Sequence, residues 1–204
     1  MNRHERRLFS HLRREHESEG RESYVEIDAP FELYALVRLL RPAHLIEVGV
    51  SSGVSSAYLL QALERNNRRT LHSIDLPKLE RPSRSKHRRP QASWSLPPGR
   101  ASGWAVPAPL RRRWDLRIGN KRNVLPLLTE ELERIDLLVY DVPHDDDETR
   151  GEFRRLDPRL PPGGVAIADH GPGGGLCAAL RWRARRRGTA PVRRAELGLY
   201  GFRA

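Results

Sequence analysis

The chain has 204 residues, of which 38% are hydrophobic and 31% charged, and its formal net charge is +11 at pH 7. This length suits one domain with a sizeable core. No apolar run approaches the roughly 20 residues that a membrane-spanning helix needs, and the charged N-terminal segment does not read as a signal peptide. Cys177 is the only cysteine, so no intrachain disulfide can form. We therefore expect a cytoplasmic protein that does not enter a membrane.

The positive charge is concentrated in two segments. Residues 78–113 hold ten Lys or Arg against one acid, Glu80, and residues 181–204 hold eight Arg against one acid, Glu196. One interpretation is a surface for an anionic partner such as nucleic acid. The other is a general preference for arginine in this chain. We favour the second, because no aromatic-interleaved motif of a nucleic-acid module accompanies the charge.

The predicted elements alternate between helices and strands along the chain. Residues 1–28 are typical of a charged N-terminal helical arm, and residues 29–204 are expected to form the main domain. Asp28-Ala-Pro30 indicates a helix start, with Asp28 as the N-cap. The strands are predicted at 44–50, 70–75, 114–120, 135–141 and 165–169, the helices at 31–41, 57–63, 124–135, 153–156 and 176–187, and a C-terminal hairpin at 191–197 with 199–204.

One long segment interrupts this alternation. Residues 77–109 are rich in Pro, Ser, Gly and Arg and show no regular period, so we expect a basic insertion in the main domain. Long loops attached to compact domains often carry function. The insertion holds Trp94 and Trp104, which are candidates to stack on a planar substrate or simply to fix the loop, and "GWAVPAPLRRRW" is expected to anchor its far end.

Alternation of strands and helices predicts an α/β fold with a doubly wound, mostly parallel sheet. In such sheets, ligands bind outside the carboxyl ends of the strands. The polar residues that end or flank the predicted strands are therefore candidate site residues: Glu47, Asp75, Asn120, Asp141 and Asp169. The alternative is that some of these residues only cap the helices that follow.

The loop after the first predicted strand reads Glu47-x-Gly49-x-x-x-Gly53-x-Ser55. It lacks the middle glycine of the dinucleotide-binding pattern G-x-G-x-x-G, and it also lacks the Gly-Lys-Ser/Thr of a phosphate-binding loop. A nucleoside-like ligand without a phosphate fits the loop better. Asp75 ends the second predicted strand, where an acid accepts ribose hydroxyls. The alternative for Gly49 and Gly53 is an ordinary tight turn.

This ordered set, together with "LPPGGVAIAD" before the fifth strand, resembles the class I S-adenosylmethionine-dependent methyltransferases, and in particular their O-methyltransferase-like branch. The resemblance implies a Rossmann-like, seven-stranded sheet with a C-terminal antiparallel hairpin. It also implies S-adenosylmethionine as cofactor. Glu47, Gly49, Gly53 and Ser55 would surround its methionine end, Asp75 would hold its ribose, Leu76 would pack on its adenine, and Asn120 would meet the adenine amino edge.

Two further segments, "YDVPHDDDE" and "IADHG", carry the candidate catalytic chemistry. Asp141 and Asp169 close neighbouring strands, and with His170 they can hold Mg²⁺ or another divalent cation that acidifies a substrate hydroxyl. His144 is then the candidate base. The set is similar to the cation-dependent O-methyltransferases of the catechol type, with His144 in place of their lysine and His170 in place of their asparagine. The alternative for Asp141 and His144 is a hydrogen-bonded strand end.

Three functions are therefore open from the sequence. The first is methyl transfer to a hydroxyl of a small-molecule acceptor. The second is methylation of nucleic acid by way of the basic segments, and the third is a cofactor-binding domain without catalysis. The acceptor itself cannot be read from the sequence, because specificity resides in loops and not in the fold. The sequence leaves the oligomeric state open, and an oligomer in which the N-terminal arm packs on a neighbour is one alternative.

Overall fold

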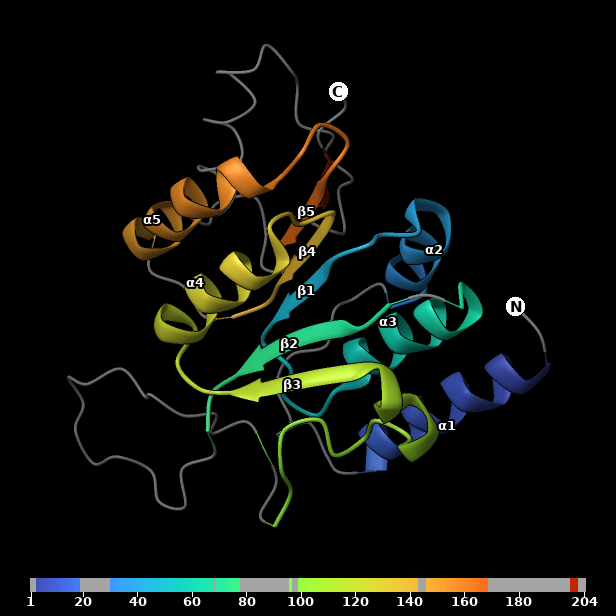
Figure 1. Cartoon of the computed structure of the whole chain (residues 1–204). Coiled ribbons are helices and arrows are strands. Elements are labelled where there is room, and N and C mark those ends of the chain that lie inside the picture. The colour runs from blue at the N-terminus through green and yellow to red at the C-terminus, as the bar shows by residue number, and fades with distance from the viewer. Residues whose placement is uncertain are drawn as a thin grey trace.

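A sheet of six strands forms the centre of the computed structural model, which describes residues 3–18, 30–67, 69–77, 96, 99–142, 146–168 and 199–201. Its order is β3-β2-β1-β4-β5-β6 (Figure 1). The strands are β1 (Leu45–Val48), β2 (Leu71–Asp75), β3 (Trp114–Ile118), β4 (Leu137–Tyr140), β5 (Val165–Ala168) and β6 (Leu199–Gly201). β1 to β5 pair in parallel, and β6 pairs antiparallel to β5. The predicted Rossmann-like, mostly parallel sheet is thus confirmed.

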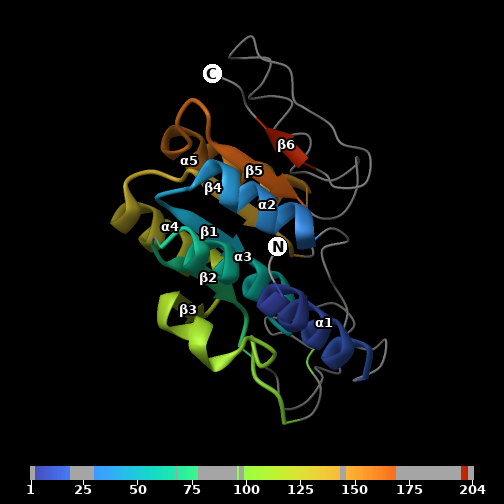
Figure 2. The same ribbon diagram turned by 90° about the vertical axis from the view of Figure 1, so that its right-hand side faces the viewer.

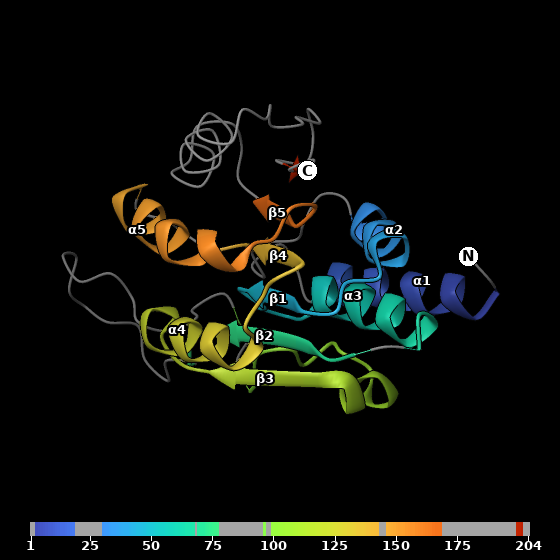
Figure 3. The same ribbon diagram turned by 45° about the horizontal axis from the view of Figure 1, so that its top comes forward.

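Helices cover both faces of this sheet. The helices are α1 (Arg3–Ser18), α2 (Pro30–Leu40), α3 (Val54–Arg65), α4 (Lys121–Leu132) and α5 (Asp146–Leu156), with 3-10 turns η1 (Ala108–Arg113) and η2 (Asp157–Arg159). Figures 2 and 3 show α1, α2 and α3 on one face and α4 and α5 on the other. Alternate residues of β1 face the two layers: Leu45 belongs to the core cluster that contains Val37 and Leu60, whereas Ile46 belongs to the cluster that contains Leu128 and Phe153.

The predicted N-terminal helix is present as α1, and it contacts the main body of the chain. Phe9 is buried and stacks on Tyr58 of α3, with ring centroids 4.0 Å apart. Glu5 is also buried, and its Oε1 accepts hydrogen bonds from Tyr34 Oη and Arg65 Nε, each at 2.7 Å. A boundary between arm and domain near residue 28 stays a prediction, because residues 19–29 are outside the described part.

The structure locates most, but not all, of the predicted elements. α4 begins at Lys121, earlier than predicted, because the Oδ1 of Asn120 caps it by accepting a 2.9 Å hydrogen bond from the Arg122 amide. β6 lies within the second half of the predicted C-terminal hairpin. The first half, at 191–197, and the predicted basic helix at 176–187 lie outside the described residues. Within the described residues, no helix is long and apolar enough to cross a membrane.

The far end of the insertion is ordered against the sheet. Residues 99–107, which we call the strap, lead directly into η1 and β3. Arg111 anchors the strap through two hydrogen bonds: its Nε donates to the Val106 carbonyl and its Nη2 donates to the Gly103 carbonyl, both at 3.0 Å. The predicted anchoring role of "GWAVPAPLRRRW" is therefore seen directly. Trp94 lies outside the described residues.

Candidate functional site

The loop between β1 and α3 contains both predicted glycines in left-handed backbone conformations. Gly49 has φ +94°, and a β-carbon there would lie 1.7 Å from the carbonyl oxygen of Asp141. Gly53 has φ +89°, and a β-carbon there would lie 2.7 Å from the Cα of Gly103 in the strap. Only glycine tolerates this combination of dihedral angle and crowding. The close backbone approach that the sequence suggested for a ligand is made, at both glycines, by the chain itself.

Glu47 lies in β1 directly before this loop, and its side chain has no exposed surface. Its carboxylate accepts hydrogen bonds from the hydroxyls of Ser55 at 2.8 Å, Ser56 at 2.7 Å and Ser73 at 2.7 Å. Burial raises the pKa of Glu47 to about 7, although the three hydroxyls act in the opposite direction. Glu47 therefore connects β1, β2 and the first turn of α3, and Ser55, also a predicted site residue, is one of its partners.

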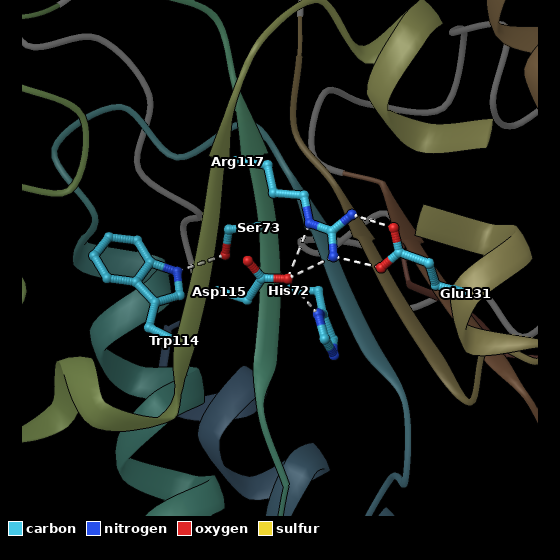
Figure 4. A network of polar contacts seen from close by, with 6 residues as sticks. All are labelled: His72, Ser73, Trp114, Asp115, Arg117 and Glu131. Atoms are coloured by element: carbon cyan, nitrogen blue, oxygen red, sulfur yellow. Dashed lines mark hydrogen bonds and ion pairs between the residues drawn. The ribbon is translucent and has the colours of Figure 1, made fainter. Parts of the chain in front are cut away.

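The sequence did not indicate that Ser73 and Trp114 belong to this network. Trp114 Nε1 donates to Ser73 Oγ at 2.9 Å, and Ser73 in turn donates to Glu47 (the Trp114–Ser73 contact is drawn in Figure 4). The Trp114 ring fills the space beside Gly103, where a β-carbon would lie 1.9 Å from it. This chain of contacts links the edge strand, the buried acid and the strap, and its members are too far apart in the sequence for a local motif to reveal them.

Asp75 ends β2 and lies beside the glycine loop. Its side chain is largely buried, its Oδ2 accepts a 3.1 Å hydrogen bond from the Ser51 amide, and its Oδ1 accepts one of 2.9 Å from the Leu76 amide. Burial raises the pKa of Asp75, while hydrogen bonds from the Ser102 hydroxyl and from the amides of Leu76, Ser51 and Val50 partly offset that increase. The structure thus brings the predicted ribose-binding acid and the glycine loop into direct contact.

The predicted adenine-side residues lie at the same edge of the sheet. The Gly119 amide donates to the Asp75 carbonyl at 2.8 Å, which holds the end of β3 against the end of β2. Leu76, which follows Asp75, is partly exposed. Asn120 follows Gly119, and its Oδ1 is used to cap α4. Asp75, Leu76 and Asn120 are therefore grouped as expected. The side-chain oxygen of Asn120 already accepts a hydrogen bond from the Arg122 amide.

Asp141 follows β4 and lies against the glycine loop. Its amide donates to the Val48 carbonyl at 2.8 Å, and its own carbonyl occupies the space left by the missing side chain of Gly49. The other predicted catalytic and metal-binding residues, His144, Asp169 and His170, lie outside the described residues. In the part of the chain that the structure describes, no group of three or more His, Cys, Asp or Glu side chains is arranged to hold a metal ion. Their roles stay predictions.

A buried charged cluster lies directly behind the site, on the α4 side of the sheet. Lys121 Nζ donates to both carboxylate oxygens of Glu152, at 2.6 and 2.7 Å, and to Tyr140 Oη at 2.7 Å. Tyr140 Oη also donates to Glu152. Tyr140 precedes Asp141, and Lys121 follows Asn120. The cluster therefore fixes α4 and α5 relative to the strand ends that carry the candidate residues.

Comparison with known proteins bears directly on this arrangement. A family model for a methyltransferase domain matches residues 46–170, which is more than half of the chain and includes the glycine loop, Asp75 and Asp141. No curated protein sequence matches the chain significantly.

Solved structures share the fold at low sequence identity. The O-methyltransferase of Bacillus cereus in complex with S-adenosylhomocysteine is 16% identical with a TM-score of 0.56, over 96% of this chain and 88% of that one. The O-methyltransferase TomG of Streptomyces achromogenes, involved in tomaymycin synthesis and in complex with S-adenosylmethionine, is 18% identical with a TM-score of 0.57, over 96% and 86%. With the Podospora anserina methyltransferase PaMTH1, at 14% identity and a TM-score of 0.49, the match covers 83% of this chain and 62% of that one.

The family match, the strand order of the sheet and the acid beside the glycine loop are all consistent with a methyltransferase domain. The chain belongs to the methyltransferase-domain family.

Proposed function

We propose that this protein transfers the methyl group of S-adenosylmethionine to a hydroxyl of a small molecule. The observation that carries the proposal is the contact between the glycine loop and Asp75 at the carboxyl ends of β1 and β2, where the Ser51 amide donates to Asp75 Oδ2 at 3.1 Å. Ligands of doubly wound sheets bind at this edge. The similar structures from Bacillus cereus and Streptomyces achromogenes are both O-methyltransferases, one in complex with S-adenosylhomocysteine and the other with S-adenosylmethionine, and they support a hydroxyl oxygen as the acceptor atom.

The residues present fit the cofactor in its nucleoside part. A buried carboxylate with a raised pKa is stabilised by hydroxyl donors, and ribose provides two of them. Leu76 supplies a partly exposed apolar side chain beside it for the adenine. Asn120, with its Oδ1 bonded to the Arg122 amide, has its amide nitrogen as the group to offer the adenine edge.

Glu47 plays an indirect part in this proposal. Because its carboxylate is buried and accepts three serine hydroxyls, it holds the glycine loop in shape, and the backbone of that loop is left to meet the methionine end of the cofactor. Ser55 shares this role through its hydrogen bond to Glu47. Gly49 and Gly53 serve the site by letting β4 and the strap approach the loop closely.

When bound, the cofactor supplies a methyl group on a positively charged sulfur. The protein then has to orient the acceptor hydroxyl and take up its proton. The position of Asp141 after β4 and its backbone contact with the glycine loop support a role for it in this task. We assign proton uptake to Asp141 and His144, with Asp169 and His170 as the further ligands of an assisting divalent cation.

The first experiment measures binding and turnover separately. We expect S-adenosylmethionine and S-adenosylhomocysteine to bind in calorimetry, and Asp75→Ala to weaken both by about a hundredfold, because two hydrogen bonds to a charged group are lost. Ser10→Ala, an exposed position on α1, is the matched control. Absence of binding to the wild-type protein would overturn the proposed function.

Turnover is followed by transfer of a labelled methyl group to a panel of phenols, catechols and alcohols. Asp141→Asn and His144→Ala should each abolish transfer while cofactor affinity stays nearly intact. Repeating the assay with magnesium and with a chelator tests cation assistance: a chelator without effect would remove the metal from the mechanism. Unchanged transfer in both variants would contradict the assignment of Asp141 and His144 as catalytic residues.

A further inference from the structure

The strap pairs with the glycine loop through main-chain hydrogen bonds. The Gly103 amide donates to the Ser51 carbonyl at 2.8 Å, and the Ala105 amide donates to the Ser52 carbonyl at 3.0 Å. The approach is close because neither Gly53 nor Gly103 has a side chain: a β-carbon on Gly53 would lie 2.7 Å from the Gly103 Cα. The strap therefore holds the loop at two of the residues that lie between its glycines.

Ser51 is the loop residue at which this support matters most. Its φ is +50°, in the left-handed region that Gly49 and Gly53 also adopt but that costs free energy for a residue with a side chain. Its carbonyl accepts the bond from Gly103, and its amide donates to Asp75 Oδ2 at 3.1 Å. A strained residue of this kind persists only where its surroundings hold it in place. The bond from the strap therefore helps to keep the Ser51 amide directed at Asp75.

Arg111 in turn fixes the strap. Its Nε donates to the Val106 carbonyl and its Nη2 to the Gly103 carbonyl, both at 3.0 Å, and Nη2 also donates to the Trp104 carbonyl at 3.3 Å. The guanidinium carbon lies 6.0 Å from the centre of the Trp114 ring, which packs against Gly103. Gly103 is thus bonded to the loop through its amide and to Arg111 through its carbonyl.

The two arginines that follow Arg111 in η1 form different contacts. Arg113 Nε donates to Glu64 Oε2 at 2.7 Å, and Arg112 donates to the other carboxylate oxygen of Glu64, near the end of α3. Arg112 and Arg113 therefore attach η1 to α3, whereas Arg111 attaches η1 to the strap. This division within one short element provides a matched control for the role of Arg111.

We propose that Arg111 is a positioning residue for the cofactor site. It holds the strap, the strap holds Ser51 in its left-handed conformation, and the Ser51 amide then orients the carboxylate of Asp75. A planar guanidinium suits this task because it can donate to several carbonyls at once, which a lysine ammonium does with less fixed geometry. The inference rests on the proposed function, in which Asp75 receives the ribose.

The first test compares Arg111→Met with Arg112→Met in calorimetric titrations with S-adenosylhomocysteine. Both variants lose one positive charge from η1, but only the first loses the bonds to the strap. We expect Arg111→Met to weaken binding about tenfold, as loss of one supporting hydrogen bond would, and Arg112→Met to bind as the wild type does. Arg111→Lys should fall between Arg111→Met and the wild type. Unchanged affinity in Arg111→Met, or equal weakening in both methionine variants, would overturn the proposal.

A second test separates positioning of Ser51 from a general loss of stability. Thermal unfolding without ligand shows which variants are folded, and Arg111→Lys takes the place of Arg111→Met if that variant is not. Glycine adopts the left-handed conformation without strain, so in a Ser51→Gly background Arg111→Met should weaken binding less than about threefold. A full tenfold loss in that background would overturn the proposal.

Turnover provides a further readout. Arg111→Met should raise the KM for S-adenosylmethionine and leave kcat nearly unchanged, because Arg111 acts on the cofactor loop. A lower kcat with an unchanged KM would contradict the assignment. Failure of the wild type and every variant to bind S-adenosylhomocysteine would instead overturn the proposed function, and this inference with it.

Discussion

Two polar networks lie on opposite faces of the neighbouring strands β2 and β3, and they differ in burial and in the hydrogen-bond donors around their acids. Neighbouring residues of β2, His72 and Ser73, point to opposite faces, as do Trp114 and Asp115 of β3 (Figure 4). On the α3 face, Trp114 and Ser73 lead to the buried Glu47. On the α4 face, His72 and Arg117 bind Asp115, and Arg117 also forms a two-pronged pair with Glu131.

The comparison shows how surroundings decide the behaviour of a carboxylate. The donors bonded to Glu47 are neutral hydroxyls, so burial dominates and its pKa rises to about 7. Burial also favours a higher pKa for Asp115, but hydrogen bonds from His72 and Arg117 outweigh it and the pKa is lowered. Glu47, Ser56 and Ser73 of the first network are buried, whereas Glu131 of the second network is about half exposed. The buried network should therefore matter far more for stability.

The largest expected effect comes from truncating each acid in turn. Glu47→Ala leaves the Ser56 and Ser73 hydroxyls without their acceptor and opens a cavity, so we expect it to lower the free energy of unfolding by about 4 kcal/mol at pH 6. Asp115→Ala should cost less than about 1 kcal/mol, since solvent screens its contacts. Urea denaturation measures both. Equal losses would show that the two networks do not differ as described.

A pH profile of stability sharpens the same contrast. Glu47 has a folded-state pKa of about 7 against an ordinary value of 4.5, so the folded state binds the proton more tightly. Its contribution to stability is fully present below pH 4.5 and is lost as pH rises through about 7, in total about 3 kcal/mol. Glu47→Gln cannot ionise and should flatten the curve between pH 5 and pH 8. A Gln variant with the wild-type slope would contradict the assignment.

The smallest expected effect is on the exposed side. The pKa of Asp115 lies below its ordinary value of 3.8, so its contacts contribute stability above that pH and lose it as pH falls through the lowered pKa. Arg117→Ala removes one of the two groups that lower the pKa of Asp115, so it should weaken this acid dependence and reduce the melting temperature only slightly. High salt should shrink the difference further, because it screens partly exposed ion pairs. A large, salt-independent loss would place this network among the buried ones.

How far the sequence could predict each site residue depends on the distance along the chain between that residue and its contacts. Asp75, Leu76 and Asn120 lie at one edge of the sheet because parallel strands end together, and this is a consequence of the alternation alone. Glu47 was predicted from the same rule, but its hydrogen bond to Ser73, 26 residues away, makes it a buried support of the loop. His144, Asp169 and His170 lie outside the described residues, so their predicted roles await the turnover measurements.

The sequence by itself determined the order of helices and strands, the parallel sheet and the position of the acid that faces the glycine loop, because each depends on patterns within a few residues. Only the tertiary structure decided what the two glycines accommodate, namely the Asp141 carbonyl at Gly49 and the strap at Gly53. These contacts join segments far apart in the chain, and their existence depends on how the strands and the insertion pack in three dimensions, which no local spacing encodes.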